Sequence, residues 1–202
     1  MIRVVVADDQ ALMRTALEHF VAQAEDLEVV GSAEDGVQAL EAARTLAPDV
    51  VLMDMQMPRM DGVEATARIS AEAPGVRVLA ITTFSSEQYL VPALRAGAAG
   101  YLVKDAPPAE VVDAIRRVHA GDAVFSARVA ADLVEAVTAA PEHADPCPAE
   151  PLAPHERLTE RELDVVRELA KGASNAEIAG ALFLAEATVK STSARSWTCL
   201  LY

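Results

Sequence analysis

The chain has 202 residues, of which 52% are hydrophobic, so it is long enough for one full domain and a smaller second one. Its formal net charge of -14 argues against non-specific binding to nucleic acid or to an anionic membrane by the chain as a whole. The two cysteines lie far apart, no apolar run is long enough to span a membrane, and the N-terminus becomes acidic too early for a signal peptide, so we expect a cytoplasmic protein with no membrane partner.

The first 120 or so residues alternate apolar runs with helical patterns. The runs are apolar enough to be strands buried on both faces, and they lie at 2–8, 27–33, 49–55, 76–82 and 100–105. Amphipathic patterns typical of helices follow each run, at 10–25, 36–47, 61–73, 85–98 and 108–121. Repeated β/α units of this size predict an α/β fold, a flavodoxin-like doubly wound parallel sheet of five strands with helices on both faces.

The second half of the chain has a different composition. Residues 126–140 are another amphipathic helix candidate, and 141–157 carry five prolines and predict an extended linker. Helical patterns then resume. We therefore expect a first domain at 1–121, a linker with one helix at 122–157 and a small all-α domain at 158–202.

Polar side chains stand at the ends of four of the predicted strands. The first strand ends in two carboxylates, the third in one, the fourth in a hydroxyl and the fifth in an ammonium: Asp8, Asp9, Asp54, Thr82 and Lys104. Carboxylates that meet at one sheet edge repel one another unless a cation binds there, and hard oxygen ligands suit Mg2+. A hydroxyl and an ammonium facing that cation would bind the oxygens of a phosphoryl group. Each residue alone is more often a turn or solvated residue, so the prediction rests on their joint occurrence.

This combination resembles the receiver domain of two-component response regulators. The matching motifs are "DD" at 8–9, "DMQMPRMDG" from 54, "TT" at 82–83 and "GYLVKD" from 100, and the resemblance covers the whole domain. The C-terminal stretch that begins "LTERELDVVREL" at 158 resembles the LuxR-type helix-turn-helix class. The resemblance implies Mg2+-dependent phosphorylation by a sensor histidine kinase, which controls homodimerisation and a DNA-binding transcriptional output.

The resemblance also implies residue roles in the pocket. Asp54 would be the phosphoacceptor. Asp9 and Asp54 would bind Mg2+ directly, Asp8 would bind it through water, and the backbone carbonyl of Gln56 would complete the protein's ligands. Enzymes that use an aspartate nucleophile for hydrolysis typically carry a second Asp two positions later, and Gln56 stands there. We therefore expect no enzyme, and at most slow autodephosphorylation.

The switch residues follow from the same resemblance. Thr82 would bond the phosphoryl group, Lys104 would pair with it, and Tyr101 would turn inward when Thr82 moves. Phe84, like Gln56, would flank the phosphate. Within the fourth helical pattern, Pro92 favours a helix that begins late, with the proline in its first turn; the alternative is a kink that loosens the switch face.

The C-terminal domain has clear signals for one helix and weak ones for the next. Ser174 and Glu177 form a capping box before "NAEIAGAL", and the recognition helix would begin near Glu186. Recognition helices contact bases from their N-terminal residues, which makes the DNA-binding candidates Thr188, Val189, Lys190 and Ser191.

The residues after Ser191 do not continue the family pattern, so DNA binding is doubtful. Residues 191–196 offer no apolar stripe, and Ala185 replaces a common N-cap Ser, a loss of about 1 kcal/mol. From 158 to 202 there are five Lys or Arg against six Asp or Glu. One hypothesis is a one-base deletion near the Lys190 codon that altered or truncated the domain; the other is a divergent native tail.

Two further interpretations stay open. The chain could be a receiver-only signalling or protein-interaction module whose DNA-binding domain is non-functional. It could also be a receiver that works without phosphorylation, although the pocket residues Asp8, Asp9, Asp54, Thr82 and Lys104 are all present.

Overall fold

The computed structural model of the chain describes residues 1–83, 87–125, 164–165, 168 and 173–189. The chain divides into two compact units, Met1–Ser126 and Ala127–Tyr202. No helix among the described residues is both long and apolar enough to cross a membrane.

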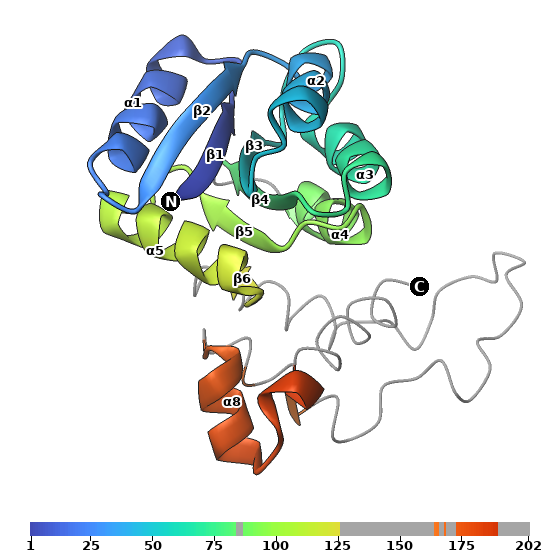
Figure 1. Ribbon diagram of the computed structural model, residues 1–202. Helices are drawn as coiled ribbons and strands as arrows, with labels where there is room; N and C mark the ends of the chain where they lie inside the picture. Colours follow the sequence, from blue (N-terminus) through green and yellow to red (C-terminus); the bar gives the residue numbers. More distant parts are fainter. Residues whose placement is uncertain (84–86, 126–163, 166–167, 169–172, 190–202) are drawn as a thin grey trace, which may run out of the picture. The chain divides into compact units, whose positions relative to one another are not determined.

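The first unit is built on a parallel sheet (Figure 1). Its strands are β1 Ile2–Ala7, β2 Leu27–Ala33, β3 Val50–Asp54, β4 Arg77–Thr82, β5 Gly100–Val103 and β6 Val124–Phe125, in the order β2-β1-β3-β4-β5-β6. This confirms the α/β fold, but the predicted count of five strands is wrong. β6 has only two residues, which pair with Gly100 and Tyr101, and a strand that short gives no periodic signal in the sequence.

Helices cover both faces of the sheet. They are α1 Ala11–Ala22, α2 Gly36–Leu46, α3 Gly62–Glu72, α4 Glu87–Arg95 and α5 Pro108–Ala120. Helices α1 and α5 lie together on one face, and α2, α3 and α4 lie on the other (Figure 1). The strand order reverses direction at β1, and crossovers of one hand then place helices on both faces, as the doubly wound prediction requires.

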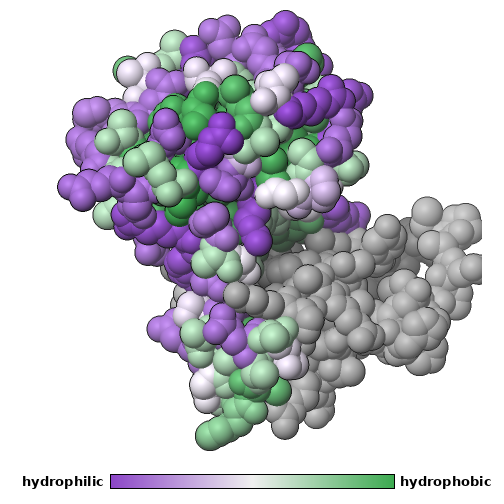
Figure 2. Space-filling view, in the orientation of Figure 1, coloured by the Kyte–Doolittle hydropathy of each residue, from purple (hydrophilic) through white to green (hydrophobic). Residues whose placement is uncertain are grey.

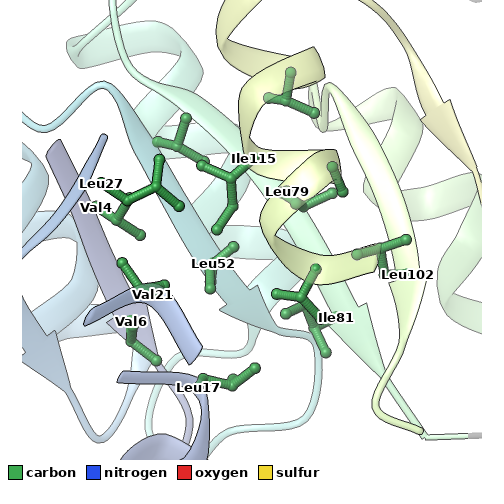
Figure 3. Close-up of a cluster of buried hydrophobic side chains, with 14 of the residues drawn as sticks. Val4, Val6, Leu17, Val21, Leu27, Leu52, Leu79, Ile81, Leu102 and Ile115 are labelled. Atoms are coloured by element: carbon green, nitrogen blue, oxygen red, sulfur yellow. The ribbon is translucent and has the colours of Figure 1, made fainter. Parts of the chain in front are cut away.

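Under α1 and α5 the sheet carries a hydrophobic core cluster. Figure 3 shows Leu17, Val21 and Ile115 from these helices packed on Val4, Leu52 and other side chains of the central strands. Burying each such side chain contributes about 1.5–3 kcal/mol, so this layer holds the strand ends in place. On the visible outer face of the first unit, hydrophilic side chains predominate around smaller apolar areas (Figure 2).

Helix α4 departs from the expectation for Pro92. The helix begins at Glu87, so Pro92 is its sixth residue and lies in the interior rather than in the first turn. Only the first four N–H groups of a helix lack a helical partner. A proline at the sixth position therefore removes one helical hydrogen bond, whereas one in the first turn would remove none. The expected late start is therefore wrong, and the loosened switch face stays a prediction.

In the second unit, the described residues include one complete helix. Helix α8 spans Asn175–Leu182, and its N-cap Ser174 forms the predicted capping box with Glu177. Phe183 ends the helix in the left-handed conformation, and a helical turn follows at 186–189. Buried Ile178 and Val189 belong to this unit. The predicted helix at 126–140 and the proline-rich linker lie outside the described residues.

Candidate functional site

The acidic residues of the predicted pocket meet at the carboxyl edge of the sheet. Asp8 and Asp9 follow β1, and Asp54 ends the neighbouring strand β3, which pairs with β1 in parallel. One carboxylate oxygen from each of the three lies within 4.8 Å of the others. The sheet therefore brings together three carboxylates that are up to 46 residues apart in the chain.

Lys104 completes this cluster from beyond β4. Its N–H donates to the carbonyl of Thr82 at 2.7 Å, which fixes the turn after β5 beside the end of β4. Its Nζ lies 2.8 Å from Asp54 Oδ2 and 2.8 Å from Asp8 Oδ2. The ammonium thus bridges two carboxylates, and its side chain is only 6% exposed.

Burial and mutual contact shift the pKa values of Asp54 and Lys104. Asp54 is 3% exposed, and its burial raises the pKa of its carboxyl group, although the ammonium of Lys104 counteracts this. For Lys104, burial works against the charged form, but the bonds to Asp54 and Asp8 outweigh it and raise its pKa. Asp54 is therefore a buried carboxylate that depends on an adjacent cation, which is suitable for a reacting group.

The donor set fits a hard divalent cation. Asp8 Oδ1 accepts the N–H of Gln10 at 2.9 Å, and its buried Oδ2 contacts the ammonium of Lys104 at 2.8 Å. Asp9 is exposed. Three carboxylates whose oxygens lie within 4.8 Å of one another match the oxygen ligands that Mg2+ prefers.

Gln56 connects the pocket to α4. Its N–H donates to Asp54 Oδ1 at 3.2 Å, and its side-chain amide donates to the Tyr89 hydroxyl at 3.4 Å. Tyr89 was not identified from the sequence, because an aromatic residue in an amphipathic helix gives no separate signal. Phe84, the other expected flanking residue, lies outside the described residues.

The two expected switch residues lie on the neighbouring strands β4 and β5. Thr82 ends β4 and is buried, and Tyr101 lies in β5 with 2% of its surface exposed. We expected the Tyr101 ring to turn inward when Thr82 moves toward a phosphoryl group. The ring is buried in this structure, and its movement with Thr82 stays a prediction.

The DNA-binding candidates are only partly described. Thr188 is exposed, whereas Val189 is fully buried, which argues against a direct contact of Val189 with DNA. Their N–H groups donate to the carbonyl of Ala185, whose methyl side chain cannot cap the turn. Lys190, Ser191 and the tail lie outside the described residues, so their roles stay predictions.

Comparison with known proteins matches both units to families. Residues 4–116 match the family described as the response regulator receiver domain, and residues 156–196 match the bacterial regulatory proteins of the luxR family. The second match extends past residue 191, where the sequence was expected to depart from the family pattern.

Relatives match across nearly the whole chain. The transcriptional regulatory protein YxjL of Bacillus subtilis, uncharacterized by its own description, is 41% identical over 94% of this chain and 84% of its own length. The transcriptional regulatory protein LiaR of the same species is 37% identical over 94% and 86%.

Solved structures support the same assignment. The signal receiver domain of NarL from Mycobacterium tuberculosis has a TM-score of 0.58 at 38% identity, covering 59% of this chain and 97% of that one. The response regulator ChrA of a heme-sensing two-component system has a TM-score of 0.58 at 35% identity, covering 95% and 86%. The chain belongs to the two-component response regulators that join a receiver domain to a LuxR-type DNA-binding domain.

Proposed function

We propose that this protein is a cytoplasmic response regulator that a sensor histidine kinase phosphorylates on Asp54, with Mg2+, to control dimerisation and DNA binding. One observation carries the proposal: a nearly buried carboxylate, Asp54, lies within 4.8 Å of two more and 2.8 Å from the ammonium of Lys104. Such a cluster supplies a nucleophile, a cation site and a fixed positive charge in one place.

Asp54 is the nucleophile. A carboxylate oxygen of Asp54 forms a bond to phosphorus while the P–N bond of the donor imidazole breaks, and the electron pair of that bond stays on the ring nitrogen. Lys104 then releases part of its contact with Asp54 and pairs with the new phosphoryl oxygens. Thr82, at the end of β4, donates its hydroxyl to another of them.

Asp8, Asp9, Asp54 and the carbonyl of Gln56 would hold the metal ion. Mg2+ bound there would neutralise phosphoryl oxygens and so lower the barrier to transfer. The added charge of about -1.5 to -2 pulls on Thr82 and Lys104, and through them on the face that includes α4, β5 and α5. Homodimerisation and the recognition helix respond to that face. We propose no enzyme activity beyond slow autodephosphorylation. The residue two positions after Asp54 is the amide Gln56, which cannot act as the second acid of a hydrolase.

Labelling of the full chain by acetyl phosphate tests this proposal. We expect an added phosphoryl mass with Mg2+, none with chelator, and none in Asp54→Asn, which keeps the shape of the side chain but removes the nucleophile. Asp61→Asn is the matched control, because Asp61 caps α3 and Asn caps equally well. Undiminished labelling of Asp54→Asn would place the phosphoacceptor elsewhere.

A second candidate is a receiver-only module whose C-terminal domain does not bind DNA. The balance of five basic and six acidic residues over 158–202 favours it, because DNA-binding surfaces usually carry a basic excess. Phosphorylation without any DNA selection would support this candidate, and a phosphorylation-dependent enrichment of one DNA sequence would exclude it.

A further inference from the structure

The loop between β2 and α2 contributes no metal or phosphoryl-binding residue, yet it contacts both loops that do. Glu34 and Asp35 form this loop. On one side of it lies the loop after β1, which carries Asp8 and Asp9. On the other side lies the loop at 55–61, which follows Asp54.

The guanidinium of Arg14 connects the loop after β1 to the loop formed by Glu34 and Asp35. Arg14, in α1, donates from Nη1 to the carbonyl of Asp8 at 2.7 Å and from Nη2 to Glu34 Oε1 at 3.1 Å. The Arg14 side chain is mostly buried, whereas Glu34 is exposed. A planar guanidinium holds two acceptors at a fixed separation, which a flexible ammonium does not do.

A second ion pair, between Arg59 and Asp35, connects the loop at 55–61 to the same loop between β2 and α2. Asp35 caps α2 with Oδ1, and its Oδ2 pairs with the guanidinium of Arg59; Asp35 is 1% exposed and Arg59 61%. The N–H of Gly36 also donates to the carbonyl of Met60 at 3.1 Å. Arg59 has a φ of 67°, a left-handed conformation that a non-glycine residue keeps only where surrounding contacts fix it.

We propose that Glu34 and Asp35, held by Arg14 and Arg59, are positioning residues that fix the separation between the loop carrying Asp8 and Asp9 and the loop that follows Asp54, and so favour Mg2+ over Ca2+. This inference rests on the proposed metal site. Mg2+ requires near-octahedral oxygens at about 2.0–2.1 Å, whereas Ca2+ accepts about 2.3–2.6 Å in flexible geometry. If the two loops become less rigid, the affinity of the site for Mg2+ should therefore fall more than its affinity for Ca2+.

The charges of the pair allow position to be separated from electrostatics. If Asp35 and Arg59 acted on the metal by charge alone, loss of the acid would weaken cation binding and loss of the base would strengthen it. If they act by position, both losses weaken Mg2+ binding. The two explanations thus predict opposite signs for Arg59.

The test is calorimetric titration of the full chain with Mg2+ and, separately, Ca2+. Asp35→Asn keeps the helix cap and removes the charge, and Arg59→Gly removes the guanidinium with a residue that tolerates the positive φ. We expect both to weaken Mg2+ binding by about tenfold, with a smaller loss for Ca2+, and the double variant to be no worse than the weaker-binding single. Arg14→Lys, which keeps the charge, should also weaken Mg2+ binding.

Arg68→Gln is the matched control, since Arg68 pairs with Glu64 at 2.8 Å on the exposed side of α3, and the Mg2+ affinity of this variant should be unchanged. Tighter Mg2+ binding by Arg59→Gly would overturn the inference. Equal losses for both metals, or a lower melting temperature with unchanged affinities, would also overturn it, by leaving these residues a purely structural role. A parent chain that binds no Mg2+ would instead refute the proposed metal site itself.

Discussion

The receiver pocket and the helical segment around α8 are specified in opposite ways. In the pocket, the decisive contacts are long-range: Lys104 reaches Asp54 across 50 positions of the chain. Around α8 they are local, since Ser174 and Glu177 cap the helix and the next turn rests on the carbonyl of Ala185. The sheet edge can therefore form where the neighbouring residues have weak structural preferences, whereas a short helix depends on its capping residues. The predictions below test that contrast.

The largest effect is expected from glycine substitutions with opposite signs in the two regions. A Cβ at Gly62 would collide with the carbonyl oxygen of Asp54 and lie 2.8 Å from the Cα of Met55, so the loop after Asp54 must shift. We expect Gly62→Ala to lose about 3 kcal/mol of stability or more. At Gly180, inside α8, an added Cβ would meet no described atom within 4 Å beyond its chain neighbours and the backbone of its own helix, so Gly180→Ala should gain about 1 kcal/mol. Calorimetric unfolding measures both, and a tolerated Gly62→Ala would refute the tight packing of this loop.

Lys104→Met should separate metal binding from signal transmission. Without the ammonium that bridges Asp8 and Asp54, the carboxylates repel one another and attract cations more strongly, so we expect Mg2+ affinity to rise roughly tenfold. Dimerisation on addition of beryllofluoride, a phosphoryl mimic, should be lost. Titration calorimetry and light scattering measure the two effects, and unchanged dimerisation would contradict the role of Lys104 as the phosphoryl partner.

The raised pKa of Asp54 predicts a pH-dependent stability. Burial raises this pKa above 3.8 in the folded state, so between pH 3.8 and the folded pKa the folded protein holds a proton that the unfolded chain has lost. Ionised Asp54 therefore lowers the stability at pH values above its folded pKa, and the loss disappears as pH falls toward 3.8. We expect Asp54→Asn without metal to unfold at a higher temperature than the parent chain at neutral pH, with the difference shrinking in acid. A less stable variant at pH 7 would contradict this sign.

A smaller effect is expected at the recognition turn. Ala185→Ser would add a side-chain acceptor at the start of the helical turn, which typically contributes about 1 kcal/mol. We expect slower hydrogen exchange at the Thr188 and Val189 amides. Ala187→Ser, inside the turn, is the control and should bring no such gain. Equal protection in both variants would show that this turn is not limited by its cap.

Much of the receiver could be predicted from the sequence, because buried parallel strands are continuous apolar runs and their ends share one edge. That rule alone predicted that Asp8, Asp9 and Asp54 lie close together. The two-residue strand β6 and the interior position of Pro92 could not be predicted, since neither changes a periodic pattern. The contacts of Arg14 with Glu34 and of Arg59 with Asp35 were also missed, because they depend on how helices pack over loops that are distant in sequence.

DNA selection from a random-sequence library most directly tests the claim that the state of Asp54 controls the LuxR-type domain. The full chain would be compared with and without beryllofluoride and Mg2+, beside its Asp54→Asn variant. The account predicts that one palindromic sequence is enriched only when the parent chain carries the phosphoryl mimic. Equal enrichment in all conditions, or enrichment by the treated Asp54→Asn chain, would contradict it.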